Sequence, residues 1–429
     1  MFDRPDSGEL AILVHLDFSS HKEREDINEF KELVSSAGME VLSIVTGSRH
    51  RPDARYYVGT GKLEEIKFEL EHGESDVVLF NHALSPSQQR NLEAYLECRI
   101  IDRTGIILDI FAQRARTHEG NLQVELAQLE YMSTRLIRGW THLERQKGGI
   151  GMRGPGETQL ETDRRLLRAR IKTLTARLEK VRKQRDQGRK ARIKAEIPTL
   201  SLVGYTNAGK STLFNRITES DVYTADQLFA TLDPTLRKID LPDVGDAILV
   251  DTVGFIRHLP HKLVEAFRAT LEETCSATLL LHVIDCHDGN RMDNIEQVEY
   301  VLNEIDAGDV PILKVYNKLD LLDEREPRID RNEEGQPIRV WVSAQSGAGI
   351  DLLHAAIAEL LGEEIVHQKI CLQPKHGKLR ALLYASSVVL SEDTNDLGLT
   401  TLDIRLQRTD YEKILRKAGM AEIDVQVLR

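Results

Sequence analysis

Residues 200–211 read Leu200-Ser201-Leu202-Val203-Gly204-Tyr205-Thr206-Asn207-Ala208-Gly209-Lys210-Ser211, and this segment is the strongest indication of the fold. The first four residues are typical of a buried strand. The next eight match the pattern GxxxxGKS/T, in which glycines let successive backbone N–H groups point at phosphate oxygens. We expect Lys210 to reach the β- and γ-phosphates and the Ser211 hydroxyl to bind Mg²⁺. Because such a pattern arises by chance in roughly one or two of every hundred chains this long, the rest of the sequence must support it.

A second phosphate element follows the apolar run 247–250 and reads Asp251-Thr252-Val253-Gly254. At the carboxyl end of a strand, Asp251 is placed to hold a magnesium-bound water, and Gly254 to offer its N–H to the γ-phosphate. The pattern DxxG is weak alone, because Asp102-Arg103-Thr104-Gly105 also matches it with no phosphate loop ahead. Its position in the chain favours Asp251.

Between these two elements lies the segment Phe229-Ala230-Thr231-Leu232-Asp233-Pro234-Thr235, followed by a predicted hairpin with its turn at 242–246. A threonine here can place its hydroxyl on Mg²⁺ and its N–H on the γ-phosphate, a contact made only with a triphosphate. Such a contact orders a switch loop and releases it on hydrolysis. We prefer Thr231 to Thr235, since Thr235 lies closer to the next strand and could serve only to cap it.

Two further elements indicate a guanine base. Asn317-Lys318-Leu319-Asp320 follows the predicted strand 311–316, and Ser343-Ala344-Gln345 follows the predicted strand 338–342. The Asp320 carboxylate can accept from both N1–H and the 2-amino group of guanine. Adenine lacks these donors there, and a buried acceptor left unsatisfied costs about 1–3 kcal/mol or more. We expect Asn317 to tie this loop to the phosphate loop, Lys318 to cover the base, and a backbone N–H of 343–345 to bind O6.

Four elements in this order, each at the end of a predicted strand, predict one guanine-nucleotide site, because ligands bind at the carboxyl ends of strands in open α/β sheets. Its catalytic residues are Lys210, Thr231 and Gly254; Ser211 and Thr231 are the direct metal ligands, and Asp251 acts through water. The complete predicted site comprises Gly204, Tyr205, Thr206, Asn207, Ala208, Gly209, Lys210, Ser211, Thr212, Phe229, Ala230, Thr231, Leu232, Asp233, Asp251, Thr252, Val253, Gly254, Asn317, Lys318, Leu319, Asp320, Ser343, Ala344 and Gln345.

The rest of the chain divides into further parts. We expect an N-terminal α/β domain at 1–118, a helical hairpin at 119–195, the α/β nucleotide domain with a mostly parallel sheet and helices on both faces at 196–364, and a small α+β domain at 365–429. The hairpin is predicted from two apolar helix faces, the second a heptad-like run from Leu167 to Val181, joined by the glycine-rich segment 147–156. The turn 59–62 (Gly-Thr-Gly-Lys) is most simply a glycine turn, although it could hold a phosphate.

Charge is distributed unevenly along the chain. The net charge is −12, yet residues 164–194 hold 14 Lys and Arg against two acids, which is +12 and leaves −24 for the remainder. Such a cationic helix can neutralise RNA phosphates, or it can be only a solvated face of a coiled coil.

Four scattered cysteines, no signal-peptide pattern and no apolar run of membrane length favour a cytoplasmic protein with reduced thiols and no integral membrane segment.

Taken together, the segment 147–163, the basic helix, the phosphate loop and the segment 229–235 resemble the HflX family. The resemblance covers most of the chain and is weakest after about residue 365. It implies a ribosome-associated GTPase that binds GTP, GDP and Mg²⁺, contacts the large ribosomal subunit and its rRNA, and splits stalled ribosomes under stress. We expect no DNA partner, a monomer, and a cytoplasmic location or peripheral attachment to a membrane.

The residue at position 255 differs from the one found there in many GTPases. Phe255 stands where a glutamine often orients the attacking water, and a phenyl ring can neither donate nor accept. We therefore predict slow hydrolysis that a partner stimulates. Arg257 and His258 lie close in sequence, without evident reach to the phosphate.

Two alternative functions stay open: a GTPase for ribosome assembly or tRNA modification, and an RNA-remodelling protein whose N-terminal domain uses ATP through Lys62.

Overall fold

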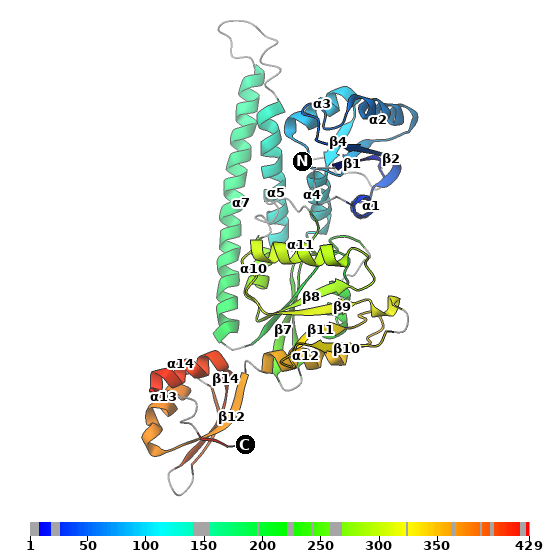
Figure 1. The fold of residues 1–429 in the computed structure, drawn as a ribbon. Coiled ribbons are helices and arrows are strands. Elements are labelled where there is room, and N and C mark those ends of the chain that lie inside the picture. The colour runs from blue at the N-terminus through cyan, green and yellow to red at the C-terminus, as the bar shows by residue number, and fades with distance from the viewer. Residues whose placement is uncertain are drawn as a thin grey trace.

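The computed structural model describes residues 8–18, 26–139, 155–194, 197–220, 227–241, 244–257, 268–322, 325–362, 365–386, 388–394, 399–420 and 426–428. Figure 1 shows an N-terminal α/β unit and a long helical hairpin beside a central α/β unit, with a small unit at the far end. This arrangement confirms the predicted fold class. The predicted domain boundaries remain predictions.

The N-terminal sheet is wholly parallel, with strand order β2-β1-β3-β4. Its strands are β1 (Leu10–Phe18), β2 (Glu40–Arg49), β3 (Val77–Phe80) and β4 (Arg99–Asp102), and its helices are α1 (Ile27–Ser36), α2 (Thr60–His72), α3 (Pro86–Leu96) and α4 (Arg103–Arg114). β1 and β3 are apolar on both faces because separate hydrophobic clusters cover each side of the sheet. In the first turns of α2, Lys62 Nζ pairs with Glu65 at 2.6 Å.

The hairpin consists of α5 (His118–Gly139) and α7 (Pro155–Lys194), which pack side by side (Figure 1). The predicted seam of α7 is more buried than the positions around it, and Leu174 on this seam has no exposed surface. The glycine-rich tip, residues 140–154, lies outside the described residues. The heptad-like apolar pattern thus correctly predicted which face of α7 packs against α5.

The central sheet has seven strands in the order β10-β11-β9-β8-β5-β7-β6. The four inner pairings are parallel, and only the two edge pairings, β6 with β7 and β10 with β11, are antiparallel. The strands are β5 (Thr199–Val203), β6 (Thr235–Leu241), β7 (Gly245–Asp251), β8 (Leu279–Asp285), β9 (Ile312–Asn317), β10 (Arg328–Arg331) and β11 (Pro337–Trp341). β10 was not predicted from the sequence.

Helices cover both faces of this sheet, as expected. α8 (Lys210–Thr218) and α12 (Ile350–Gly362) pack on one face, and α10 (Arg268–Cys275) and α11 (Arg291–Glu304) on the other. A short 3-10 helix, η1 (Leu319–Leu321), follows β9. Because β5, β7 and β9 are parallel, their carboxyl ends lie along one edge, and the loops that follow them meet there.

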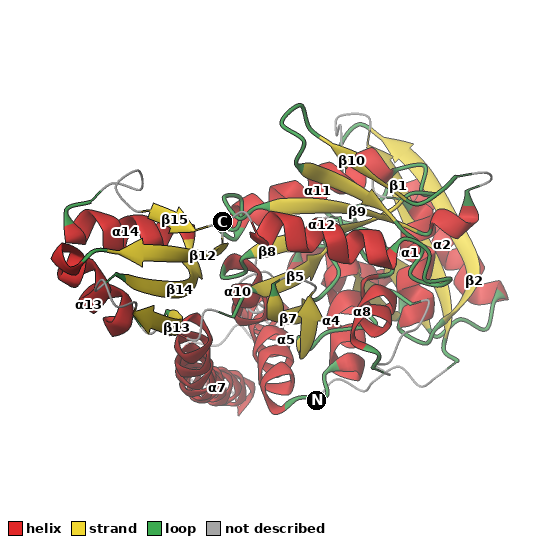
Figure 2. Cartoon of the chain, turned by 90° about the horizontal axis from the view of Figure 1, so that it is seen from below, coloured by secondary structure: helices red, strands yellow, loops and turns green. Residues whose placement is uncertain are grey.

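The C-terminal unit is an antiparallel sheet in the order β13-β14-β12-β15, covered by two helices and set apart from the central sheet (Figure 2). Its elements are β12 (Ile365–Leu372), η2 (Pro374–His376), α13 (Gly377–Ala385), β13 (Val389–Thr394), β14 (Thr400–Gln407), α14 (Arg408–Ala418) and β15 (Gln426–Leu428). β13 and β14 form an antiparallel pair in which Thr394 lies opposite Thr400, and residues 395–398 between them lie outside the described chain.

One hydrophobic core joins parts of the chain that the sequence analysis treated separately. It combines residues of β1, α1 and α4, residues of α5, and the loop residues Leu228, Phe229, Leu232, Val253 and Ile256 of the central unit. The N-terminal unit, the hairpin and the two loops that follow the phosphate loop therefore pack as one body around this core.

Candidate nucleotide site

The phosphate loop joins β5 to α8, and two of its glycines are required by the backbone. Gly204 has φ +148° and Gly209 has φ +88°. A Cβ at Gly204 would lie 2.3 Å from the Val283 carbonyl oxygen, and one at Gly209 would lie 2.3 Å from Asn317 Nδ2. No other residue type fits so close an approach in this region of φ, which is why the pattern needs glycine at both positions.

Lys210 is the first residue of α8 and is 6% exposed. Its Nζ donates to the carbonyl oxygens of Gly204 at 3.1 Å and Tyr205 at 2.7 Å, so the ammonium lies inside the curve of the phosphate loop. Burial lowers the pKa of Lys210 to about 8, while the nearby Asp251 carboxylate acts in the opposite direction. The loop therefore holds a buried cation at the place where phosphate oxygens are expected.

Three oxygen-bearing side chains from separate elements meet next to Lys210. Ser211 Oγ and Thr231 Oγ1 are 2.7 Å apart, and they donate to Asp251 Oδ2 at 2.8 and 3.0 Å. Asp251 is fully buried, and its Oδ1 has no hydrogen-bond partner within the described parts of the chain. Burial raises the pKa of this carboxyl group. Thr235, in contrast, is the first residue of β6 and pairs with Asp251 in the sheet.

These three groups fit Mg²⁺. It prefers hard oxygen ligands and commonly takes one or two from the protein, and a buried carboxylate with an unsatisfied oxygen beside two hydroxyls offers that set. The geometry agrees with the preference for Thr231 over Thr235, because only Thr231 directs its hydroxyl at Ser211 and Asp251.

A cavity surrounds this cluster, and most of the predicted phosphate residues line it. The lining residues are Thr206, Asn207, Gly209, Lys210, Ser211, Thr212, Gln227, Phe229, Ala230, Thr231, Thr252 and Gly254. Gly254 forms a tight part of the wall, since a Cβ there would lie 2.8 Å from Thr206 Cγ2 and 3.0 Å from Lys210 Nζ. Gln227 was not predicted, because no pattern marks it in the sequence.

Among the predicted residues whose side chains point away from this cavity are Leu232, Asp233 and Val253. Leu232 and Val253 belong to the hydrophobic core shared with the N-terminal unit. The Asp233 carboxylate accepts hydrogen bonds from the backbone of Arg116 and Thr117, just before α5. Of these three residues, none lines the cavity around Lys210, and their position in the switch segments is what brought them into the prediction.

Phe255 has a structural role that explains its side chain. Its N–H donates to the Gly204 carbonyl at 3.1 Å, and its carbonyl accepts from the Thr206 N–H at 2.7 Å, so the backbone extends the sheet onto the phosphate loop. The ring is 3% exposed and packs with Leu271 and Val298 under α10 and α11. It faces the core and supplies no polar group to the phosphate site.

The guanine elements meet through Asn317. Its Nδ2 donates to the Ala208 carbonyl of the phosphate loop, and its Oδ1 accepts from the Ala344 N–H, both at 2.9 Å. Asp320 is exposed and accepts a hydrogen bond from the Ser343 hydroxyl. Three segments far apart in sequence are thereby held together at the edge where a base would lie, as the sequence analysis expected of Asn317.

The remaining residues of the guanine elements have other contacts. Lys318 Nζ pairs with Asp285 at 2.8 Å, and Leu319 is buried in a small core next to Trp341. The Gln345 carbonyl accepts from Arg216 of α8, as does that of Ala344 at 3.1 Å. The contacts with Arg216 fix the 343–345 loop relative to α8, and those of Lys318 and Leu319 hold the other base loop next to β8 and Trp341.

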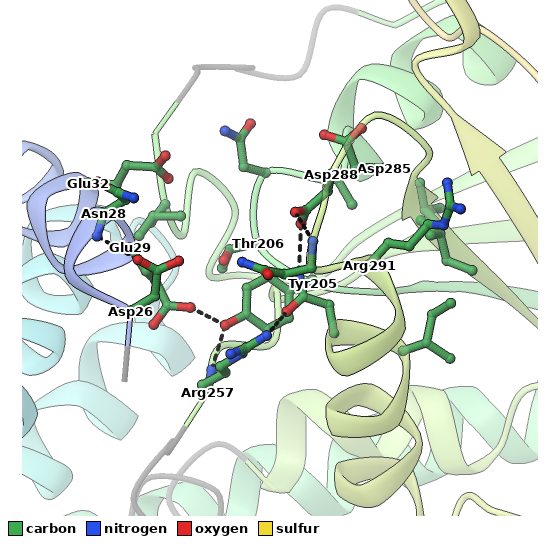
Figure 3. A pocket seen from close by; sticks show the side chains of 18 of the residues that line it. Asp26, Asn28, Glu29, Glu32, Tyr205, Thr206, Arg257, Asp285, Asp288 and Arg291 are labelled. Carbon is green, nitrogen blue, oxygen red and sulfur yellow. Dashed lines mark hydrogen bonds between the residues drawn. The ribbon is translucent and has the colours of Figure 1, made fainter. Parts of the chain in front are cut away.

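The N-terminal unit contacts the phosphate loop through a buried polar network (Figure 3). The Tyr205 hydroxyl donates to Glu29 of α1 and accepts from the Arg257 N–H at 2.9 Å. Arg103, which is 3% exposed, pairs with the same Glu29 and donates to the Arg257 carbonyl at 3.1 Å. The segment Asp102–Gly105 matched DxxG, but Asp102 caps α4 by accepting the Gly105 N–H at 2.8 Å.

At least three of the described arginines of the basic helix attach it to the rest of the protein, and the first of them, Arg170, donates from Nε to Glu125 of α5 at 2.7 Å. Arg182 pairs with Glu272 of α10, and Arg185 Nε lies 2.9 Å from Glu119 of α5. Burial raises the pKa of Glu119, and Arg185 opposes that shift. Lys183, between them, is exposed. The cations of α7 therefore divide into those that bind the protein itself and those that face outward.

Four family models match the chain. Residues 24–112 match the model described as GTP-binding GTPase N-terminal, 114–192 the GTP-binding GTPase middle region, 199–318 the 50S ribosome-binding GTPase, and 329–426 the HflX C-terminal domain.

Curated relatives cover almost the whole chain. GTPase HflX of Escherichia coli strain K12 is 61% identical over 417 residues, which are 97% of this chain and 98% of the relative. The chain belongs to the HflX family of GTPases. GTPase HflX of Magnetococcus marinus is 47% identical, over 93% of this chain and 92% of the relative. A solved structure, the SsGBP–GDP complex, matches at 25% identity with a TM-score of 0.46, over 83% of this chain and 99% of that one.

Family membership and the site geometry agree. As a member of a GTPase family, the chain binds guanine nucleotide and is a GTP hydrolase, and its recognition from motifs is confirmed. Among the described helices, none is both long and apolar enough to cross a membrane.

Proposed function

We propose that this GTPase binds GTP together with Mg²⁺ through the Ser211, Thr231 and Asp251 cluster, and that the nucleotide state sets its affinity for the ribosome. The observation that carries the first part is the convergence of these three side chains beside buried Lys210. The second part is supported by the match of 199–318 to a 50S ribosome-binding GTPase family and by the cations of α7.

The side chains of this site have distinct tasks in binding and hydrolysis. Lys210 neutralises charge that develops on the β- and γ-phosphate oxygens, and the Gly254 N–H donates to the γ-phosphate. Bound Mg²⁺ supplies further neutralisation of phosphate charge. Thr231 can make its contact only while a γ-phosphate is present, so its loop is the part that changes on hydrolysis.

Water positioning is the task that the described residues leave open. The ring of Phe255 is buried in the core, and the Arg257 guanidinium donates to Asn294 at 3.0 Å, while His258 lies outside the described residues. We therefore expect slow hydrolysis by the protein alone and stimulation by a partner that contributes or orders the missing group. The large ribosomal subunit is the partner we propose.

The hairpin is the element proposed to meet rRNA. Its helix α7 is lined with exposed cations such as Lys172, Lys180 and Lys183, whose attraction to phosphates is strong at low salt and weakens as salt is added. Structured RNA is recognised largely through its backbone and shape, which suits a protruding cationic hairpin. The resemblance implies that the protein splits stalled ribosomes under stress.

The decisive experiment measures GTP hydrolysis in parallel with buffer, tRNA, small subunits and large subunits. We expect a marked increase only with large subunits, and none with Lys210→Ala. Equal rates in all four conditions would contradict the proposed partner. Sucrose-gradient sedimentation of 70S ribosomes with a slowly hydrolysed GTP analogue tests splitting. Association with assembly precursors in place of mature subunits would favour a role in ribosome assembly.

A further inference from the structure

The switch segment 227–233 is bounded on the side away from the phosphate cavity by the N-terminal unit and the hairpin. The Leu228 N–H donates to Ser36 Oγ at 3.0 Å. The Phe229 ring packs edge-on against Phe111 of α4, with centroids 4.7 Å apart. Leu232 lies in the shared core with residues of α4 and α5. The segment thus rests on a protein surface, and its last residue, Asp233, makes the most specific contact.

Asp233 binds the start of α5. Its Oδ2 accepts the backbone N–H groups of Arg116 at 2.9 Å and Thr117 at 2.8 Å, and its Oδ1 accepts the Thr117 hydroxyl. Thr117 in turn caps the helix, because its Oγ1 accepts the Gly120 N–H at 2.9 Å. A carboxylate from another part of the chain therefore completes the N-terminus of α5, where N–H groups lack helical partners and the helix dipole favours negative charge.

Gly120 makes this approach possible. A Cβ at position 120 would lie 2.1 Å from Asp233 Oδ1 and 3.2 Å from Thr117 Oγ1. Glycine within a helix is otherwise less favourable than alanine. Glycine, a residue of low helix propensity, therefore stands in the first turn of α5 at the position that the Asp233 carboxylate approaches.

We propose that Asp233 is a positioning residue. It couples the nucleotide state to the hairpin by capping α5 from a distant segment of the same chain. Thr231 lies two residues before it and directs its hydroxyl at Ser211 and Asp251. When a triphosphate holds Thr231, Asp233 is held at the start of α5; when the loop is released, the cap is lost. This inference rests on the proposed role of Thr231. It adds the route from the nucleotide to the helix that leads to the hairpin tip.

Coupling of this kind is reciprocal. If triphosphate binding strengthens the cap, then removal of the cap must weaken triphosphate binding relative to diphosphate binding by the same factor. Loss of an N-cap costs about 0.5–2 kcal/mol, which corresponds to roughly two- to thirtyfold in an equilibrium constant. Because Thr117 and its hydrogen bonds with Asp233 are exposed to solvent, we expect an effect of about fivefold.

The test compares the dissociation constants for a slowly hydrolysed GTP analogue and for GDP. Asp233→Asn removes the charge with little change in shape, and Gly120→Ala excludes the carboxylate while it favours helix formation. Both are expected to lower the preference for the analogue about fivefold and to leave the GDP constant unchanged. The matched control is Asp240→Asn, an exposed carboxylate on β6, which should behave as wild type.

A second measurement separates coupling from a general loss of stability. Amide hydrogen exchange at 118–122 should be slower with the GTP analogue than with GDP in the wild type, and equal in both states in Asp233→Asn. Equal exchange in both states of the wild type would overturn the coupling. So would unchanged nucleotide preference in both variants while Thr231→Ala loses it. If Thr231→Ala also keeps its preference, the proposed function of Thr231 itself is wrong.

Discussion

Asn317 is the residue whose replacement should disturb the nucleotide site most without touching phosphate chemistry. It is 2% exposed and joins the phosphate loop to the loop at 343–345 through two hydrogen bonds of 2.9 Å, with the Ala208 carbonyl and the Ala344 N–H. Asn317→Ala leaves both backbone groups without their partner. A buried polar group left unsatisfied costs about 1–3 kcal/mol, so the pair should cost about 2–6 kcal/mol.

The lower limit of this cost, about 2 kcal/mol, predicts how much nucleotide affinity Asn317→Ala loses. A nucleotide needs both loops in place, so a cost of about 2 kcal/mol predicts at least about thirtyfold weaker affinity for GTP. GDP should lose affinity by the same factor, because the base and the phosphate loop are common to both nucleotides. This equality distinguishes the Asn317 variant from Thr231 and Asp233 variants, which are expected to alter the ratio of the two.

Binding is measured by equilibrium titration with a fluorescent GTP or GDP analogue. Asn303→Ala is the matched control, since Asn303 is exposed on α11 and its Nδ2 donates to Glu299 of the same helix at 2.9 Å. We expect the control to stay within twofold of wild type. If folded Asn317→Ala bound both nucleotides within about threefold of wild type, the idea that Asn317 holds the site together would be refuted.

Phe255→Gln should not speed intrinsic hydrolysis, because the side chain faces the core; a melting experiment should show a loss of stability instead. Nucleotide affinity should fall as the pH rises above about 8, because burial lowers the pKa of Lys210 to about 8 and bound phosphates favour its charged form. Binding near this pH should therefore be accompanied by proton uptake, which calorimetry in two buffers of different ionisation enthalpy detects. Lys183→Glu should weaken ribosome pelleting more at low salt than at high salt, whereas Arg182→Gln and Arg185→Gln should mainly loosen α7 from α10 and α5, detectable as faster hydrogen exchange there.

Much of the site was predictable because its chemistry depends on short segments. The glycines of 204–209 are set by local φ values and close backbone approaches, so they appear as a fixed pattern in any chain with this loop. Asn317 was assigned its bridging role from its place after β9, and the structure gives it that contact. The α7 seam followed from a period of apolar residues alone.

Other features left no pattern that could be recognised. β10 is a short edge strand of Arg328–Arg331, with too few apolar residues to be distinguished from a loop. Arg103 seemed part of a chance DxxG match, yet it is buried against Glu29 and the Arg257 backbone. Contacts between residues more than a hundred positions apart depend on how separate units pack, and no local period encodes them.

The phosphate loop, the guanine site and the cationic hairpin could be predicted from the sequence, because backbone conformation and amphipathic periods are local properties. The folded structure was needed to show that the switch segment packs on the N-terminal unit, that Asp233 contacts Thr117, and that Arg182 and Arg185 bind the protein itself. The physical reason is that burial and electrostatic pairing depend on which surfaces meet, and that is settled by the packing of whole units.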